Sequence, residues 1–415
     1  MRKGEWCEVS AREERSARWA WLIAGGIVAF MLAFAAGCGS DDDDEGEASA
    51  DLPTEVGEGE GELNLIGWAG YAEDGSTDPS VDWVTDFEKE TGCKVNFKPG
   101  ATSDEMVQLM RTGQYDGVSA SGDASGRLVE GGDVAPVNLE LVPNYEDVVD
   151  ALKEQPYNTF DGQAYGVPHG RGSNLLLYNT DEVKPAPSSW DVVFDKAGDY
   201  SGKVTAYDNP IYIADAALYL QEHNPELGIT DPYELDQEQF DAAIDLLKQQ
   251  GEHVGEYWSD AFKEVSAFEN GDTVVGTTWQ YQANLLQGEG EPVETVLPEE
   301  GATGWSDTWM LSSEAEHPNC MYLWMDHILD PEVNAKVAVW FGEAPANVKS
   351  CEFTGKLPAA YFGTKDHCEV FHADDEEFFD QIEYWKTPVS DCGDDRGDVC
   401  KTYDEWVQGW NEVKG

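Results

Sequence analysis

Short apolar strands alternate with amphipathic helices along most of the chain, and this alternation restricts it to α/β folds. Residues 63–68 (LNLIGW) alternate as a strand does, and Asp78 followed by proline is typical of a helix start. Residues 94–97 (KVNF) form a second expected strand, and Thr102 with Glu105 is the capping box of a second helix. This spacing predicts right-handed crossovers and a mainly parallel sheet.

The same pattern returns further along the chain. Residues 175–178 (LLLY), 203–207 (KVTAY) and 273–279 (TVVGTTW) are expected strands separated by helical segments. A chain of 415 residues exceeds the size at which one hydrophobic core usually keeps growing, so we expect two lobes. In such a protein a ligand is expected where strand ends meet the boundary between the lobes.

The charge of the chain excludes several classes of partner. The sequence has 83 Asp and Glu against 25 Lys and Arg, a formal net charge of −58. Such a surface repels nucleic acid and anionic lipid headgroups, so no nucleic-acid partner is expected. We interpret most of this charge as a solvated acidic surface, which does not by itself indicate the ligand.

The N-terminus has the layout of an export signal. Arg12, Arg15 and Arg18 precede the apolar run WAWLIAGGIVAFMLAF, and small residues then lead to Cys38. This pattern predicts a signal peptide over residues 1–37, and it resembles the bacterial lipobox, in which Cys38 would be lipidated. The alternative is an uncleaved membrane anchor. Both interpretations place the rest of the chain outside the cytoplasm, tethered to the outer face of the membrane.

An acidic segment follows the lipidation site. Residues 38–62 hold eleven Asp and Glu, no Lys or Arg and almost no apolar side chains. Because such a segment cannot offset its ordering entropy by burial, we expect a disordered, self-repelling tether. The folded body is expected to start near Leu63.

The remaining cysteines suggest disulfides. Cys351–Cys368 and Cys392–Cys400 are the local pairs, which leaves Cys93 with Cys320. A zinc site built from His367, Cys368 and His372 is the alternative, but no CxxC spacing supports it, and we expect no metal.

Aromatic residues follow the expected strands, whereas common enzyme motifs are absent from the sequence. There is no GxSxG, HExxH, Walker or GxGxxG pattern, so no catalytic residue is assigned. Trp68, Tyr71, Trp279 and Trp305 instead lie after strands, and Trp305 has Asp307 beside it. Because ring faces attract cations, this set predicts a cleft that holds an alkylammonium group.

These features occur within a longer resemblance. The chain resembles the extracellular solute-binding proteins of ABC importers, and among them the spermidine/putrescine-binding branch. Seven segments carry the resemblance in order between about residues 63 and 347: GWAGYAED, FEKETGCKVNF, GQYDGVSAS, YGVPHGRGSNLLLYN, VVGTTWQY, EEGATGWSDTW and FGEAPAN. The final segment, with its four cysteines, departs from the pattern.

The resemblance implies a periplasmic-binding-protein-like fold of type II, in which two α/β lobes are joined by crossing strands and close on a ligand. It divides the chain into the first part of lobe 1 at 63–170, the first part of lobe 2 at 171–302, a return to lobe 1 at 303–346 and a C-terminal lobe 2 segment at 347–415. All three disulfides would then lie within lobes and leave closure free.

The resemblance also implies roles for the site residues. Trp68 and Tyr71 would lie on one wall and Ser121 in the facing loop. Trp279 and Trp305 would stack on the methylene groups of the ligand.

The charged contacts follow in the same way. Asp307 would accept a charged hydrogen bond from an amine. Asp208, or the neighbouring Asn209, falls where the family has a second acidic contact.

Two positions depart from the family. Tyr212 stands where polyamine binders place a glutamate, so one counter-charge is missing. Arg171 replaces an aromatic residue on a crossing strand and could receive a carboxylate, or it could pair with a nearby acid instead. Both departures favour a zwitterionic ligand, such as an amino acid derivative or a betaine, as the alternative to a polyamine.

The sequence therefore predicts a monomeric, lipid-anchored binding protein without a cofactor, which passes a small amine-bearing solute to the permease of an ABC importer. An extracytoplasmic enzyme on the same scaffold is a second hypothesis, and Asp307 with His169 is its one candidate pair. An adhesion or sensor lipoprotein that uses the fold without transport is the third.

Overall fold

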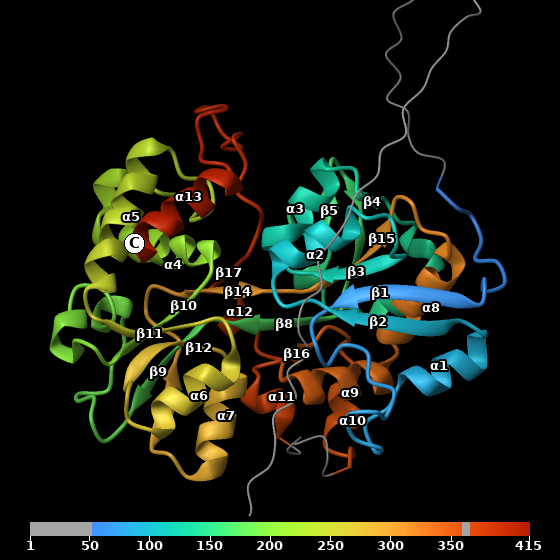
Figure 1. The fold of residues 1–415 in the computed structure, drawn as a ribbon, viewed down its shortest axis with the longest axis horizontal. Helices are drawn as coiled ribbons and strands as arrows, with labels where there is room; N and C mark the ends of the chain where they lie inside the picture. The colour runs from blue at the N-terminus through green and yellow to red at the C-terminus, as the bar shows by residue number, and fades with distance from the viewer. Residues whose placement is uncertain (1–51, 359–365) are drawn as a thin grey trace, which may run out of the picture. The chain divides into compact units, whose positions relative to one another are not determined.

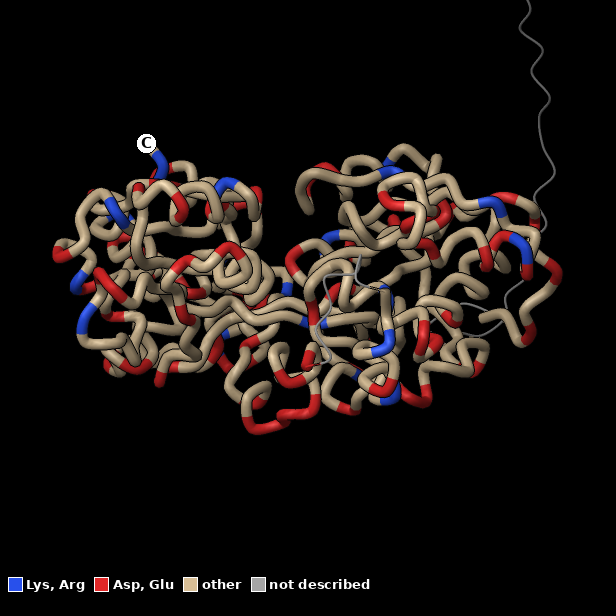
Figure 2. The backbone as a smooth tube through the Cα atoms, turned by 90° about the horizontal axis from the view of Figure 1, so that it is seen from below, with Lys and Arg blue, Asp and Glu red and all other residues tan. Residues whose placement is uncertain are grey.

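The computed structural model describes residues 52–358 and 366–415, which belong to one compact unit. The predicted signal peptide, Cys38 and the first part of the acidic segment lie outside the described residues. Within the described ranges, no helix has the length and apolar character needed to span a bilayer. Asp and Glu positions are distributed over both lobes in Figure 2, as expected for an acidic surface.

A mostly parallel sheet forms lobe 1. Its strand order is β2-β1-β3-β15-β4, with β7 paired to β15, and β15 runs antiparallel to β3. The strands are β1 Glu62–Gly67, β2 Lys94–Pro99, β3 Gly117–Ala120, β4 Val134–Ala135, β7 Gly166–Pro168 and β15 Thr308–Ser312. The helices are α1 Val84–Thr91, α2 Ser103–Met110, α3 Gly122–Glu130, α8 Pro318–Ile328 and α9 Pro331–Phe341, and a hairpin joins β5 Thr159–Phe160 to β6 Gln163–Ala164.

Two helix starts in this lobe differ from the prediction. The carboxylate of Asp78 accepts from the amide of Ser80 at 2.8 Å and holds a turn, so α1 begins later, at Val84. Thr102 does cap α2 by accepting from the Glu105 amide, but the Glu105 carboxylate bonds the amide of Ala101 rather than that of Thr102. The capping box is therefore only half formed.

A second sheet forms lobe 2, with strand order β11-β10-β12-β9-β13. Strand β10 is parallel to β11 and β12, whereas β9 is antiparallel to β12 and β13. The strands are β9 Leu175–Asn179, β10 Val204–Tyr207, β11 Val254–Trp258, β12 Val275–Thr278 and β13 Val293–Val296. The helices are α4 Ile213–His223, α5 Gln237–Gly251, α6 Ala261–Glu269, α7 Gln280–Glu289 and α13 Tyr403–Lys414.

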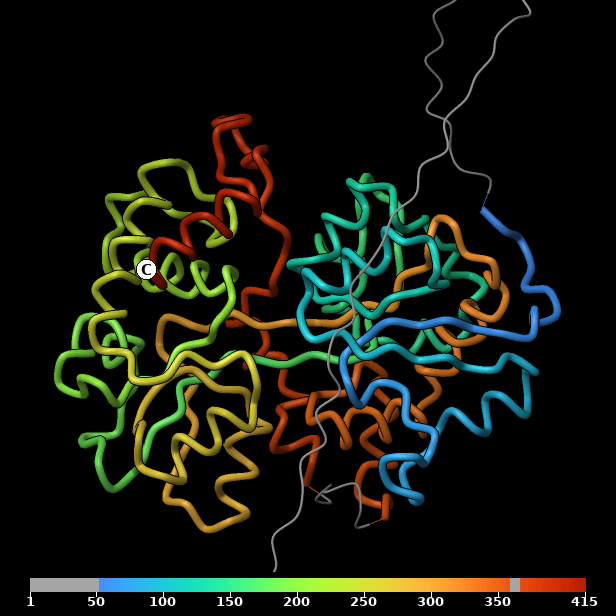
Figure 3. The backbone as a smooth tube through the Cα atoms, viewed as in Figure 1, coloured from blue at the N-terminus to red at the C-terminus, as the bar shows by residue number. Residues whose placement is uncertain are grey.

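The lobes are joined by a small sheet of order β16-β8-β14-β17 (Figures 1 and 3). Its strands are β8 Gly170–Ser173, β14 Ala302–Trp305, β16 Ala344–Pro345 and β17 Ile382–Tyr384. Strand β8 leads from lobe 1 into lobe 2, and β14 leads back. Glycines allow close approach here, because a Cβ on Gly304 would lie 2.6 Å from the main-chain oxygen of Gly172.

The C-terminal segment passes between the lobes. It contains α10 Cys351–Thr354, α11 His367–Val370 and α12 Glu376–Phe379. Helix α10 packs against α9 of lobe 1, whereas Phe371 and Phe378 pack against the core of lobe 2. The disulfides join Cys93 to Cys320, Cys351 to Cys368, and Cys392 to Cys400. The second of these therefore lies where the chain passes between lobes, not inside lobe 2 as expected, because α10 still packs on lobe 1.

Folded contacts begin before Leu63. The Glu60 carboxylate accepts from the amides of Asn319 and Cys320, each at 2.9 Å, and the amide of Gly57 donates to the Asn319 side chain. The described end of the acidic segment is therefore held against the start of α8.

Candidate functional site

A cavity of about 290 Å³ lies between the strand ends of the two lobes. Residues after β1 and β3 and the turn between β14 and β15 supply its lobe 1 side, and residues after β10, β11 and β12 supply its lobe 2 side. Its aromatic lining includes Trp68, Tyr207, Phe262, Trp279, Trp305, Phe341 and Trp385, and its acidic lining is Asp208, Asp260 and Asp307.

Asp307 is the buried acid of this cavity. It lies in the turn between β14 and β15, and its side chain accepts from the Tyr71 hydroxyl at 2.7 Å and the Ser121 hydroxyl at 2.6 Å. Burial raises the pKa of Asp307 to about 6, although both hydrogen bonds oppose this shift. Because its hydrogen-bond partners are neutral hydroxyls, the carboxylate is oriented without being neutralised, which suits an incoming ammonium group.

A second buried acid lies behind Asp307. Glu343 is fully buried, and its Oε2 is 3.2 Å from the Tyr71 hydroxyl. His169 Nδ1 lies 3.7 Å from Glu343 Oε1, while His169 Nε2 bonds the Ser119 hydroxyl at 2.8 Å. Burial raises the pKa of Glu343 to about 8 and lowers that of His169 to about 4.

This arrangement does not form the pair of the enzyme hypothesis. The ring of His169 bonds Ser119, and His169 meets Asp307 through its main-chain amide, which donates to the Asp307 carbonyl at 3.1 Å. A general base would need its ring nitrogen within hydrogen-bond reach of the proton it abstracts.

The rings of the cavity contact one another as a group. Tyr207 stacks on Trp385 with centroids 5.8 Å apart, and it meets Trp279 edge-on at 5.5 Å. Trp279 in turn meets Trp305 edge-on at 6.2 Å, and its indole nitrogen donates to Asn174 at 2.8 Å. Such contacts fix the ring faces that would flank a ligand chain.

Sequence reasoning missed four of the seven aromatic residues that line the cavity: Tyr207, Phe262, Phe341 and Trp385. Tyr207 is the last residue of the expected strand 203–207 and of β10, whereas Trp279 is the first residue after β12. Trp385 lies just after β17, in the segment that departs from the family pattern. No local sequence pattern indicates Glu343 either, because its place behind the cavity depends on contacts with Tyr71 and His169 from distant parts of the chain.

The other two acids differ from Asp307. Asp208 lines the cavity, but its carboxylate accepts from Lys414 Nζ at 2.9 Å and from the indole of Trp410 at 3.2 Å. Asp260 is exposed and uses one oxygen to cap α6 through the amide of Phe262 at 2.8 Å. Among the described residues, Asp260 forms no ion pair under 4.0 Å with Lys or Arg.

Six of the nine predicted contact residues line the cavity: Trp68, Ser121, Asp208, Trp279, Trp305 and Asp307. Tyr71 contacts the cavity through Asp307. The structure does not bring the remaining two, Tyr212 and Arg171, to it.

Tyr212 lies in the core of lobe 2, only 1% exposed, and its hydroxyl accepts from Gln250 at 2.9 Å. It precedes α4, and the side chains at the start of that helix are buried. A glutamate at this position would be buried in the core of lobe 2. It could not supply the counter-charge to the cavity that the family resemblance implied.

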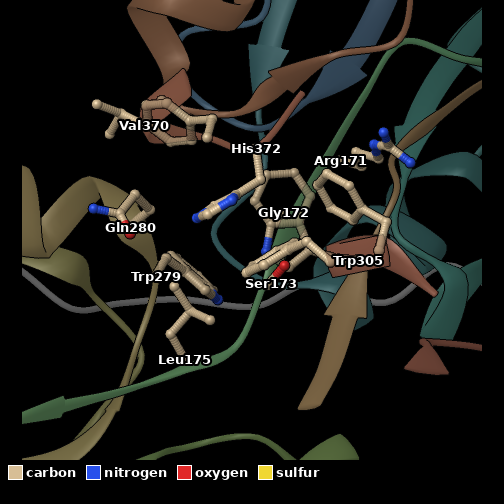
Figure 4. A pocket seen from close by; sticks show the side chains of 13 residues that line it. Arg171, Gly172, Ser173, Leu175, Trp279, Gln280, Trp305, Val370 and His372 are labelled. Carbon is tan, nitrogen blue, oxygen red and sulfur yellow. The ribbon is translucent and has the colours of Figure 1, made fainter. Parts of the chain in front are cut away.

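Arg171 lines a second, smaller cavity of about 20 Å³ that also contains Trp279 and Trp305 (Figure 4). Its guanidinium lies 3.5 Å from the ring centre of Phe379 and donates to the Ala373 carbonyl at 3.1 Å. Successive side chains of a strand point to opposite faces. On β8 this alternation directs Arg171 to the C-terminal segment rather than to the ligand cavity.

The alternative of a zinc site at His367, Cys368 and His372 is wrong, because its cysteine is in a disulfide. Cys368 is bonded to Cys351, which removes the thiolate that zinc would need. In the part of the chain that the structure describes, no group of three His, Cys, Asp or Glu side chains could hold a metal ion.

Comparisons with known proteins show the family of the chain. The model of the bacterial extracellular solute-binding protein family matches residues 82–358. The putrescine/agmatine-binding protein of Pseudomonas aeruginosa is 26% identical over 310 residues, covering 69% of this chain and 81% of the relative. The spermidine/putrescine-binding periplasmic protein of Escherichia coli is 23% identical over 292 residues, covering 68% and 80%.

A solved structure shows the same fold. The spermidine/putrescine ABC transporter substrate-binding protein of Streptococcus pneumoniae superposes with a TM-score of 0.63 at 18% identity, covering 85% of this chain and 97% of that one. The family and these relatives are transport components rather than enzymes. The two lobes, their crossing strands and the family match together show that this chain belongs to the bacterial extracellular solute-binding proteins.

Proposed function

We propose that the chain captures a small organic cation with a primary ammonium group, a polyamine such as putrescine or spermidine, outside the cytoplasm. The observation that carries this proposal is Asp307, a buried carboxylate at the wall of an aromatic cavity, held by neutral donors. Ring faces stabilise an alkylammonium by about 0.5–2 kcal/mol each.

The same cavity argues against the zwitterionic alternative. None of the described residues that line it is a lysine, arginine or histidine, so the charged side chains that a ligand carboxylate would meet there are Asp208, Asp260 and Asp307. Arg171, the residue that suggested a carboxylate partner, is engaged with Phe379 and Ala373. A ligand with cationic ends is therefore favoured.

Delivery to a permease and anchoring through Cys38 belong to this proposal. The relatives are polyamine-binding proteins by name, and the Streptococcus pneumoniae structure is the substrate-binding protein of an ABC transporter. Two lobes that close by a hinge motion around a ligand would present a different surface to a permease when loaded.

A ligand screen tests the proposal. The purified chain would be titrated with putrescine, spermidine, γ-aminobutyrate and glycine betaine while its thermal unfolding is followed. A polyamine at 100 times its dissociation constant should stabilise the chain by about 2.7 kcal/mol. Stabilisation by the zwitterions alone, or by sugars, would show that the proposed ligand class is wrong.

A further inference from the structure

Glu343 is a fully buried acid placed directly behind the ligand-binding carboxylate. It follows the left-handed Gly342 at the end of α9 and leads into β16. Its carboxyl group rests against the backbone of β8, since a Cβ on Gly170 would lie 2.1–2.3 Å from the carboxyl atoms. The carboxyl group is therefore fixed in place rather than free to turn toward solvent.

Among the described residues, the groups that face Glu343 include no lysine or arginine. The Tyr71 hydroxyl comes from the loop after β1, and His169 Nδ1 lies between β7 and β8. Asp307 is reached through Tyr71, and His367 from α11 contacts only the main-chain oxygen of Glu343, at 2.8 Å. Burial keeps the pKa values of His169 and His367 low, at about 4, so both rings are neutral at pH 7.

The Tyr71 hydroxyl lies between the carboxyl groups of Asp307 and Glu343, and it can donate to only one of them at a time. One hydroxyl hydrogen cannot serve both carboxyl groups, and its shorter contact is to Asp307, at 2.7 Å against 3.2 Å to Glu343. Two ionised carboxylates on one buried hydroxyl, without a cation, would repel each other strongly. If Glu343 keeps its proton, it donates to the Tyr71 oxygen and Tyr71 donates to Asp307, so the Tyr71 hydroxyl is used both as acceptor and as donor.

We propose that Glu343 is a positioning residue that acts through Tyr71 to keep the single negative charge of this pair on Asp307, at the cavity wall. This inference rests on the proposed amine-binding function. When an ammonium group binds Asp307, its positive charge also favours ionisation of Glu343. Amine binding should therefore release a proton from Glu343, with the effect growing as the pH approaches 8, where burial places the Glu343 pKa.

Calorimetry with putrescine tests this directly. Titrations at pH 6.5, 7.2 and 8.0 in phosphate and in Tris, whose ionisation enthalpies differ, give the number of protons released. We expect the wild-type chain to release a measurable fraction of a proton at pH 8.0, where Asp307, with a pKa of about 6, is already ionised and contributes no proton.

The decisive variant is Glu343→Gln. Its amide donates to Tyr71 as the neutral acid does, so the affinity at pH 7.2 should stay within about threefold of wild type, while the proton release at pH 8.0 disappears. Tyr71→Phe provides a second variant: it removes the hydroxyl that lies between the two carboxyl groups and donates to Asp307, so both the amine affinity and the proton release at pH 8.0 should fall. Asp215→Asn is the matched control: this buried acid of lobe 2 has its pKa raised to about 8 but bonds Thr303 rather than Tyr71, so proton release should persist.

The outcomes separate the two proposals. Equal proton release by wild type and by Glu343→Gln would overturn the role of Glu343 while leaving amine binding intact. The absence of any proton release from the wild-type chain would do the same. A wild-type chain that binds no amine at any pH would overturn the proposed function, and this inference with it.

Discussion

Two cavities share Trp279 and Trp305, and they have opposite chemistry. The larger cavity contains Asp307 and no basic side chain among the described residues that line it, whereas the smaller contains Arg171. The smaller one, about 20 Å³, has room for about one water molecule, because the C-terminal segment fills the rest. Of these two cavities, the larger is the one that we propose holds the solute.

The difference shows how a charge becomes available or unavailable to a ligand. Arg171 has an aromatic face and a carbonyl oxygen from the chain itself, so its charge is used within the fold. Among the described residues, the side-chain donors to Asp307 are two neutral hydroxyls, so we propose that its charge remains for a ligand. The partner of a buried ion, rather than its distance from the ligand cavity, separates the structural ion from the binding one.

The largest expected effect is at Asp307. Asp307→Asn retains the shape and the hydrogen-bond acceptor but loses the charge, so putrescine affinity should fall at least about 100-fold, which corresponds to about 2.7 kcal/mol. Calorimetry measures the affinity, and far-ultraviolet circular dichroism verifies the fold. Unchanged affinity would show that Asp307 does not bind the amine and that the two cavities do not differ in the way proposed.

Arg171 should affect stability instead. Arg171→Ala removes a cation–π contact and buried packing, so the free energy of unfolding should fall by about 2 kcal/mol. Urea unfolding measures this loss, and putrescine affinity should change by less than about threefold. A strong gain in amine affinity would mean that the guanidinium repels the ligand and that the two cavities are not electrostatically separate.

The pH dependence of stability should also differ between variants at Glu343, behind the larger cavity, and at Arg171, in the smaller one. Burial raises the folded-state pKa of Glu343 above its usual range, to about 8, so its contribution to stability is complete below about pH 4 and is lost as the pH rises toward 8. Glu343→Gln should reduce the downward slope between pH 5 and 8 by at most about 1.4 kcal/mol per pH unit. In Arg171→Ala the slope should remain parallel to wild type, because this substitution leaves Glu343 and its hydrogen-bond partner Tyr71 in place. Urea unfolding at pH 5, 6.5 and 8 measures these slopes; an equal slope in Glu343→Gln would contradict the assignment.

The smallest effect is expected at Asp260, the exposed acid on the lobe 2 wall. Asn caps helices as Asp does, so Asp260→Asn should fold normally. A screened contact to the second ammonium of a diamine is worth up to about 1 kcal/mol, so putrescine affinity should drop by up to about fivefold while butylamine affinity stays constant. Asp236→Asn, at the start of α5, is the control, since Asp236 caps a helix but does not line the cavity. Equal losses for both amines would show that Asp260 acts nonspecifically.

Much of the site was predictable because it follows strand ends. The alternation of strands and helices predicted both lobes, the position after a strand indicated Trp68 and Trp279, and the family resemblance implied the role of Asp307. Arg171 was misplaced because one residue of register on a strand reverses the face, and the sequence does not specify that register. The Glu343–Tyr71–His169 group was not predictable, because three distant segments must fold before its burial exists.

The stacked and edge-on rings of the large cavity also make it an intrinsic optical probe. Trp279, Trp305 and Trp385 lie close enough to Tyr207 and to one another for excitation energy to pass between them. A guest inserted among these rings should alter their emission. Capture and release can then be followed in real time through the protein's own fluorescence, without an attached dye.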